Sequence, residues 1–380
     1  MTQATTAVEG VSLRLGGFSL RDIDLTVAPG QILVILGPNG AGKSVTLETI
    51  AGFHRPKAGR IVIGGRDVTD LPPERRRVGL LFQNFGLFPH LTVAANIVLG
   101  LRAGRKPAMR PHDPALAPLL ARFHIDHLAD RLPEDLSPGE KQRTALARAL
   151  AMQPDLFMFD EPFSALDAQS RETLREELRA FLRETRIPAI FVTHDQADAA
   201  TLADRLAIMN HGAIVQEGPA ADLFKAPANV FVADFVGIDN RLPGRVIGRA
   251  GDRWRIDVGG RLLLARDDRF AGETDANVFV CIRGEDVVLR GAGITECGNA
   301  ATNRLTMRVV GVSGLGAFRK VALDGDFPLV AYLTRRDTEK LGLAPGDDTI
   351  VEIDPEAIHL LTDSGGNTIQ WSRPDASTRA

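Results

Sequence analysis

The sequence predicts an α/β domain with a parallel sheet, followed by a smaller all-β domain. Three short apolar runs, at residues 32–36, 156–159 and 190–192, have the composition of strands buried on both faces. These runs alternate with segments of helical pattern, which is typical of a parallel sheet covered by helices. From about Gly237 onward the chain consists of short β-like runs broken by glycines. This change within one chain indicates at least two domains.

The composition along the chain sets the expected boundaries. A length of 380 residues leaves room for two or three domains. We expect a first domain at 1–236, with a helical subdomain at about 89–155, and a β domain at 237–362. The polar, glycine-rich tail at 363–380 is expected to be disordered.

The β domain contains an internal repeat. Residues 240–246 (NRLPGRV) recur as 303–309 (NRLTMRV), and residues 282–289 have a counterpart at 353–360. A recurring segment of this length predicts two copies of one small structural unit. We therefore expect a tandem, barrel-like arrangement of OB type.

A glycine-rich loop carries the first sign of chemistry. Residues 37–44 (GPNGAGKS) match the pattern GxxxxGK[ST] between an expected strand and an expected helix. Backbone N–H groups of such a loop wrap phosphates, while Lys43 would reach the β- and γ-phosphates and Ser44 would bind Mg²⁺. The predicted ATP-binding residues of the loop are Gly37, Pro38, Asn39, Gly40, Ala41, Gly42, Lys43 and Ser44.

Two carboxylates follow the apolar run at 156–159. Asp160 and Glu161 should emerge at the carboxyl edge of the sheet, where ligands bind in such folds. Asp160 would hold the metal shell, and Glu161 would orient or deprotonate the attacking water. A strand that ends in Asp-Glu is by itself more often a solvated strand end. Together with the phosphate loop, the pair indicates phosphoryl transfer.

Residues 136–143 (LSPGEKQR) resemble the LSGGQ signature of ABC ATPases. The other motifs follow in that family's order: Gln83 resembles the Q-loop glutamine, residues 164–167 (SALD) the D-loop, and His194 the switch histidine. The resemblance covers about residues 1–235. It implies a P-loop NTPase fold, that is, a RecA-like parallel sheet with a helical signature subdomain and an antiparallel β part.

The same resemblance implies roles for individual residues. Glu161, His194 and Gln83 would act in catalysis, and Gln83 would also contact Mg²⁺. Two subunits would form a homodimer around two ATP molecules. Three residues, all in the signature and the D-loop, would contact the ATP bound to the other subunit: Ser137, Gly139 and Asp167.

Residues 137–140 (SPGE) also form a capping box, with Ser137 at the N-cap, Pro138 at N1 and Glu140 at N3. Both interpretations can hold, because a capped helix end is itself an anion site. Pro138 replaces a glycine of the family pattern and has no N–H group. We therefore expect a weakened contact with the other subunit's ATP, in an enzyme that remains active.

The adenine site is less defined. The family usually stacks an aromatic side chain on the base from the first strands, where Phe18 is the one aromatic residue. Leu15 is the alternative by position, and Phe18 is equally compatible with a place in the core.

Bulk properties exclude some classes of partner. The net charge is −3, so we expect no nucleic-acid partner. Residues 78–101 contain no Asp, Glu, Lys or Arg, but their Gln, Asn and His side chains are costly in lipid. We expect this stretch to be buried or to face a partner.

The resemblance to ABC ATPases implies a partner for part of this stretch. In related importers the region that corresponds to residues 82–91 forms the groove that receives a coupling helix of the membrane subunit.

The β repeat resembles the transport-associated OB domains of importer ATPases. This resemblance implies integral membrane permease subunits, an extracytoplasmic solute-binding protein and a peripheral place on the cytoplasmic face of the inner membrane. Residues 42–52, 71–76 and 327–335 resemble molybdate/tungstate importer ATPases, with sulfate as the next cargo. An iron or polyamine importer is the alternative, and a non-transport ABC ATPase is a lower one.

The β repeat could also be a ligand-sensing module that inhibits the ATPase. Molybdate-binding repeats of this type supply serine and lysine donors, whereas this chain has AATN at 300–303 and Asp-Pro-Glu at 354–356. Carboxylates at that place repel a dianion. We therefore expect the repeat not to bind molybdate or tungstate.

Overall fold

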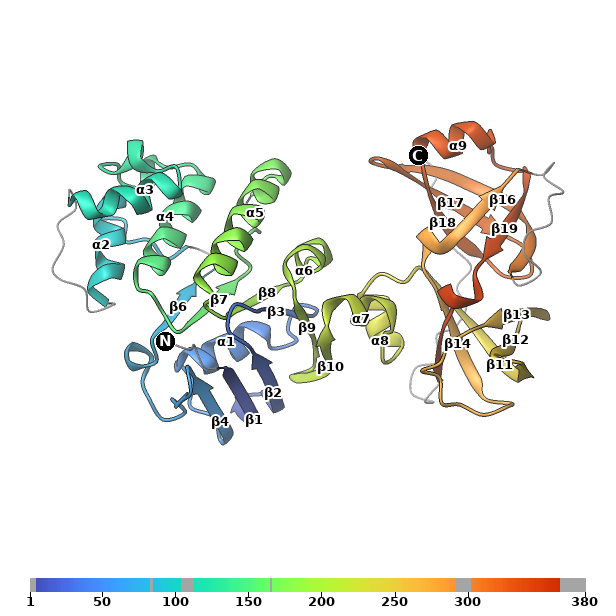
Figure 1. The fold of residues 1–380 in the computed structure, drawn as a ribbon, viewed down its shortest axis with the longest axis horizontal. Helices are drawn as coiled ribbons and strands as arrows, with labels where there is room; N and C mark the ends of the chain where they lie inside the picture. The colour runs from blue at the N-terminus through green and yellow to red at the C-terminus, as the bar shows by residue number, and fades with distance from the viewer. Residues whose placement is uncertain (1–4, 83–84, 104–112, 165, 292–301, 363–380) are drawn as a thin grey trace. The chain divides into compact units, whose positions relative to one another are not determined.

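The computed structural model describes residues 5–82, 85–103, 113–164, 166–291 and 302–362 (Figure 1). Contacts divide the chain into two compact units, Met1–Leu223 and Phe224–Ala380, and each is described by itself. The boundary expected between residues 236 and 237 stays a prediction. The expected tail at 363–380 lies outside the described residues.

A six-stranded sheet forms the centre of the first unit, in the order β10-β9-β3-β8-β7-β6. Its strands are β3 (Ile32–Leu36), β6 (Val78–Leu81), β7 (Leu156–Asp160), β8 (Ala189–Thr193), β9 (Arg205–Asn210) and β10 (Ala213–Pro219). All neighbouring strands pair in parallel except β10, which is antiparallel to β9. Every residue of β3 and β8 is buried, as a sheet covered on both faces requires.

An antiparallel sheet covers one side of this unit, in the order β2-β1-β4-β5. It consists of β1 (Thr6–Leu15), β2 (Phe18–Val27), β4 (Ala58–Ile63) and β5 (Arg66–Asp67). Helix α1 (Lys43–Ala51) contributes Leu47 and Ile50 to the same core cluster as Val8 of β1 and Leu33 of β3. The two sheets therefore share one core with α1, the helix that follows the phosphate loop.

The remaining helices of the first unit are α2 (Val93–Ala103), α3 (Ala117–Arg122), α4 (Pro138–Ala151), α5 (Ala168–Thr185), α6 (Gln196–Leu202) and α7 (Ala220–Lys225), which reaches the boundary. Short 3₁₀ turns are η1 (Pro73–Arg75), η2 (Pro114–Leu116), η3 (Asp126–Leu128) and η4 (Pro133–Asp135). Helices α2, α3 and α4 gather at one end of this unit (Figure 1). Within the described part of the chain, no helix is long and apolar enough to cross a membrane.

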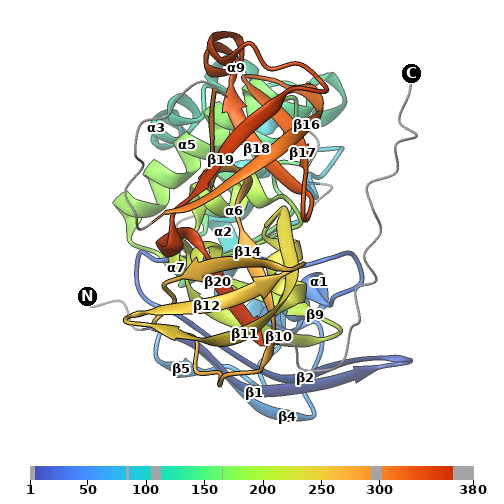
Figure 2. The same ribbon diagram turned by 90° about the vertical axis from the view of Figure 1, so that its right-hand side faces the viewer.

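The second unit contains α8 (Val230–Phe235), α9 (Arg335–Leu341), η5 (Gly284–Asp286), η6 (Pro355–Ala357) and two five-stranded antiparallel sheets (Figure 2). The first sheet has the order β13-β12-β11-β14-β20, with β11 (Asn240–Ala250), β12 (Arg253–Val258), β13 (Arg261–Ala265), β14 (Asn277–Ile282) and β20 (His359–Thr362). The second has the order β15-β19-β16-β17-β18, with β15 (Val287–Arg290), β16 (Asn303–Leu315), β17 (Phe318–Asp324), β18 (Leu329–Thr334) and β19 (Asp348–Ile353). One core cluster joins both sheets.

The two sequence repeats exchange their last strands. Strand β15 closes the first repeat but pairs with β19, and β20 closes the second repeat but pairs with β14. The buried asparagines that begin the repeats reinforce this exchange. Asn240 bonds the backbone of Val330 in edge strand β18, and Asn303 bonds the backbone of Leu264 in edge strand β13. The recurring Asn of the sequence repeat thus binds each repeat to the other.

Candidate active site

The phosphate loop lies between β3 and α1. Gly40 and Gly42 adopt φ angles of 79° and 107°, a left-handed region that favours glycine. A Cβ atom on Gly37 would collide with the backbone carbonyl of Met209 in β9. Close backbone packing therefore requires glycine at position 37, while the left-handed backbone favours it at positions 40 and 42. Asn39, Gly40 and Ser44 are exposed, so this side of the loop is accessible to solvent.

Lys43 is folded over its own loop. Its Nζ atom donates to the carbonyl oxygens of Gly37 at 2.8 Å and Pro38 at 3.1 Å. Burial lowers the pKa of the Lys43 ammonium, and the carboxylates of Glu161 and Asp160 oppose this effect. The ammonium therefore lies against its own loop, within the field of the predicted base Glu161 and of the predicted metal ligand Asp160.

Ser44 and Asp160 lie together at the edge of the sheet. The Ser44 hydroxyl donates to Asp160 Oδ1 at 3.1 Å. Burial is the main cause that raises the pKa of Asp160, with further upward effects from Glu161 and Glu48 and downward ones from the Ser44 bond and Lys43. Mg²⁺ prefers hard oxygen ligands and is usually held by one or two carboxylates together with substrate phosphates. A hydroxyl beside a destabilised carboxylate, next to a phosphate loop, fits such an ion.

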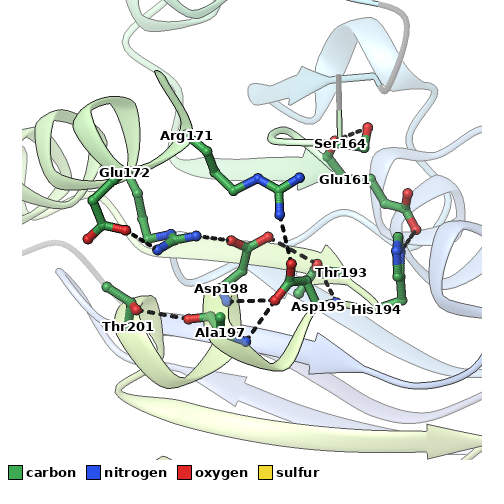
Figure 3. A network of polar contacts seen from close by, with 11 residues as sticks. Glu161, Ser164, Arg171, Glu172, Thr193, His194, Asp195, Ala197, Asp198 and Thr201 are labelled. Carbon is green, nitrogen blue, oxygen red and sulfur yellow. Dashed lines mark hydrogen bonds and ion pairs between the residues drawn. The ribbon is translucent and has the colours of Figure 1, made fainter. Parts of the chain in front are cut away.

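Glu161 and His194 are in contact. The Nδ1 atom of His194 lies 2.9 Å from Oε1 of Glu161 (Figure 3). Glu161 has a φ angle of 47°, an uncommon left-handed conformation for a residue with a side chain, and its N–H donates to the carbonyl of Val192 at 2.9 Å. Strained backbone of this kind is often found where side chains must be aimed. The turn at the end of β7 thus directs the Glu161 carboxylate toward His194, which follows β8.

The segment after Glu161 is held by α4. The side-chain amide of Gln142 donates to the carbonyl oxygen of Pro162, and Gln142 is completely buried. Sequence reasoning did not single out this residue. A signal was present, because Gln142 lies on the same helical face as the buried Leu146 and Ala149 and interrupts an apolar stripe. Through this bond the signature helix contacts the backbone next to Glu161.

Ser137 caps α4, which confirms the predicted capping box. The Glu140 N–H donates to Ser137 Oγ at 3.4 Å, and Glu140 Oε2 accepts from Ser137 N and from Ser137 Oγ, each at 2.7 Å. These bonds are the main cause that lowers the pKa of Glu140. A Cβ atom on Gly139 would lie 3.8 Å from Cδ2 of Leu166. The signature therefore adjoins the D-loop segment.

The structure describes two further predicted residues, Phe18 and Asp167. Phe18 is half-buried and packs against the core, with its ring end against Gly42 of the phosphate loop. Stacking on adenine stays a prediction for Phe18. Asp167 is exposed, and its carbonyl accepts from the Arg171 N–H at 2.9 Å. Gln83 lies outside the described residues.

Comparison with known proteins identifies the family. The ABC transporter family model matches residues 20–164, and the TOBE domain model matches residues 299–360. The chain is 39% identical over 356 residues to the molybdate/tungstate import ATP-binding protein WtpC of Pyrococcus horikoshii, covering 93% of this chain and 99% of that protein. The chain belongs to the ABC transporter family.

Other relatives of this ABC ATPase are import ATP-binding proteins as well. It is 38% identical over 352 residues to the sulfate/thiosulfate protein CysA of Mycobacterium bovis, covering 92% of each chain. It is 41% identical over 267 residues to the spermidine/putrescine protein PotA of Ruegeria pomeroyi, covering 70% of this chain and 72% of that one.

A solved structure supports the enzymatic assignment. The dimeric post-hydrolysis state of the ATP-binding cassette MJ0796 bound to ADP and Pi matches this ABC ATPase with a TM-score of 0.51 and 28% identity, covering 57% of this chain and 98% of that chain. The predicted P-loop NTPase fold, the OB-like domain and the ATPase activity of an importer subunit are confirmed. The roles of single residues remain predictions.

Proposed function

We propose that this ATPase drives the uptake of a tetrahedral oxyanion, with molybdate or tungstate as the first candidate and sulfate as the next. The observation that carries the proposal is the identity to WtpC, which extends over 93% of the chain and so includes the second unit. The relationship to CysA is almost as extensive. The relationship to PotA of Ruegeria pomeroyi, with 41% identity over 70% of the chain, keeps a polyamine importer as the second candidate.

ATP binding follows from the loop geometry. The backbone N–H groups of residues 37–44 would surround the phosphates, and Lys43 would exchange its two carbonyl partners for phosphate oxygens. Ser44 and Asp160 would hold Mg²⁺. The bound ion would neutralise part of the phosphate charge. The raised pKa of Asp160 supports this role, because a nearby cation would relieve the cost of its buried charge.

Hydrolysis would depend on the contact between Glu161 and His194. Glu161 would orient or deprotonate the attacking water, and His194 would contact the γ-phosphate. Because one nitrogen of His194 lies at the Glu161 carboxylate, the second remains for the phosphate. The histidine would then align the base with the phosphorus atom that the water attacks.

The assembly is also part of the proposal. By its relationship to importer subunits, the chain would form a homodimer in which Ser137, Gly139 and Asp167 contact the other subunit's ATP. Two permease subunits would bind it at the cytoplasmic face of the membrane, with a solute-binding protein on the outer side. Three phenylalanines of the first unit are exposed: Phe53, Phe82 and Phe88. The rings of Phe53 and Phe82 lie 6.1 Å apart. Exposed apolar side chains that lie together often mark an interaction surface, which supports a permease contact.

Uptake measurements test the cargo. Cells that lack this gene should accumulate less molybdate, tungstate and sulfate, while polyamine and ferric iron uptake stays unchanged. A plasmid copy of the gene should restore uptake, and a copy with Lys43→Ala should not, because the ATP phosphates lose their ammonium contact. If only polyamine or iron uptake falls, the oxyanion assignment is wrong and the importer assignment stands.

A further inference from the structure

Two ion pairs join the beginning of α5 to the beginning of α6 (Figure 3). Arg171 Nη1 lies 2.8 Å from Asp195 Oδ2, and Arg175 Nη2 lies 2.5 Å from Asp198 Oδ1. The arginines are four residues apart and so share one face of α5. The aspartates occupy the N-cap and the first turn of α6. The two helix starts are therefore held together by paired charges.

The two pairs differ in burial. The Arg175 and Asp198 side chains are each 6% exposed, and burial is the main cause that raises the pKa of Asp198. Removing one member of such a pair leaves an uncompensated buried charge, which destabilises a fold strongly. The Arg171 and Asp195 side chains are 27% and 30% exposed. Water can solvate either of them, so this second pair can be changed without the same damage to the fold.

Asp195 holds the backbone directly after His194. Its Oδ1 accepts from the N–H groups of Ala197 at 2.7 Å and Asp198 at 3.3 Å, while its own N–H donates to Thr193 Oγ1 at 3.0 Å. His194 therefore lies between a buried strand and a capped helix start. With its Oδ2 bonded to Arg171, both carboxylate oxygens of Asp195 have partners in the protein. This arrangement fixes the peptide from which the His194 ring extends toward Glu161.

Arg171 connects this peptide to the D-loop. The Arg171 N–H donates to the carbonyl of Asp167 at 2.9 Å, so Arg171 lies in the first turn of α5, directly after the D-loop residues 164–167. At the other end of that loop, Ser164 Oγ donates to the carbonyl of Glu161 at 3.0 Å. The Arg171 side chain thus closes a ring of contacts that runs from Glu161 through the D-loop and Asp195 to His194 and back to Glu161.

We propose that Arg171 is a positioning residue for ATP hydrolysis, which acts through Asp195 to hold His194 against Glu161. The proposal rests on the proposed roles of Glu161 and His194. Without the guanidinium, Asp195 keeps its capping bonds but loses its link to α5, so the His194 peptide gains freedom relative to the D-loop. The phosphate loop has no part in these contacts, and ATP binding is therefore retained.

The test compares steady-state ATPase kinetics of Arg171→Met with those of a matched control. The control is Glu184→Gln, which removes the exposed 2.6 Å ion pair with Arg122 near the other end of α5. For Arg171→Met we expect kcat to fall about tenfold because the reacting groups are misplaced. The KM for ATP and the melting temperature should equal those of the control. Arg171→Lys should recover most of the lost kcat, since an ammonium can still pair with Asp195.

A double-mutant cycle shows whether Arg171 acts through Asp195. Asp195→Asn keeps a good N-cap but removes the charge, so it should lower kcat as Arg171→Met does. The two changes together should lower kcat no further than either one alone. Additive losses, a rise in KM, or equal losses in Arg171→Met and Arg171→Lys would overturn the proposal. So would a kcat for Arg171→Met equal to that of Glu184→Gln.

The same assay separates this inference from the function on which it rests. Glu161→Gln should abolish turnover if Glu161 is the base. If Glu161→Gln keeps the wild-type kcat, the proposed catalytic roles fail and the positioning role of Arg171 fails with them. If Glu161→Gln is inactive while Arg171→Met retains full turnover, only the positioning role fails.

Discussion

Glu140 occupies both hydrogen-bond donors of Ser137: its Oε2 atom accepts from the Ser137 N–H and from the Ser137 hydroxyl, each at 2.7 Å. Ser137 begins the signature helix α4 and is the residue expected to contact the ATP of the other subunit. The ABC signature pattern has glutamine at the place of Glu140. If Ser137 contacts that ATP, the Glu140 carboxylate would compete with the γ-phosphate for the same two donors, and Pro138 supplies no N–H group to compensate.

Glu140→Gln should strengthen ATP-dependent dimerisation. Hydrogen bonds to an ionised acceptor are about twice as strong as neutral ones, so a neutral side chain releases the Ser137 donors more readily. Glutamine also satisfies the capping box, so α4 should remain intact. Analytical ultracentrifugation with ATP should show a lower dimer dissociation constant for Glu140→Gln. The matched control is Glu134→Gln, an equal charge change at an exposed position close to the signature. Equal dimerisation of both variants would show that Glu140 does not compete with the phosphate.

Glu161→Gln should bind ATP but lose turnover. The amide cannot accept a proton from water, and loss of a general base typically costs about 100-fold or more in rate. Lys43 and the phosphate loop are unchanged, so nucleotide affinity should persist and ATP should trap the dimer. Equilibrium binding, phosphate release and sedimentation measure the three properties. Lys43→Ala serves as the contrasting variant that should lose binding itself. Turnover at the wild-type rate in Glu161→Gln would remove Glu161 from the catalytic role.

Several features of the fold and of the candidate site could be predicted from the sequence, because they depend on residues that are neighbours in the chain. The capping box at 137–140 is one. The turn between β9 and β10 is another, because residues 210–212 (NHG) have the composition of a turn between two strands. There His211 and Gly212 have φ angles of 45° and 77°, as a two-residue hairpin turn requires. The phosphate loop and the buried parallel strands also follow from local pattern. In each case composition and spacing alone determine the local conformation.

Other features depend on contacts between distant segments and could not be predicted in this way. The bond from Gln142 to Pro162 joins residues 20 positions apart, and the pair of Arg171 and Asp195 joins residues 24 positions apart. The same holds for the left-handed conformation of Glu161. The sequence repeat predicted two copies of a β structure. It could not predict that Asn240 and Asn303 each bind an edge strand of the other repeat. Exchange of strands depends on tertiary packing.

Stability of the second unit should fall at acidic pH through Asp267. Burial raises the pKa of this carboxyl, but the bonds from His359 at 2.7 Å and from the Leu360 N–H at 2.8 Å outweigh it and hold the pKa below its usual value. A lowered folded-state pKa adds stability above the unfolded pKa of about 3.9, and this stability is lost as the pH falls through the folded value.

Thermal unfolding between pH 7 and pH 3 tests this expectation. Asp267→Asn should cost about 1–3 kcal/mol at neutral pH, because its buried donors lose a charged acceptor, and it should weaken the acid dependence. Asp268→Asn, at the exposed neighbouring position, should behave as wild type. An acid dependence in Asp267→Asn as steep as in the wild type would assign the effect to other carboxylates.

The second unit should not bind molybdate. At the end of the second repeat, Asp354 caps η6 by accepting from the Glu356 N–H at 2.9 Å, and Glu356 pairs with Arg266 at 2.9 Å. Both carboxylates thus have structural partners in a place where an oxyanion would need donors, and their charge repels a dianion. Calorimetric titration of the full-length Lys43→Ala protein with molybdate and tungstate should give no binding heat. The Lys43→Ala change weakens the phosphate loop, where a tetrahedral oxyanion could otherwise bind in place of phosphate. Saturable micromolar binding in this variant would contradict the expectation and restore an inhibitory, ligand-sensing role for the repeat.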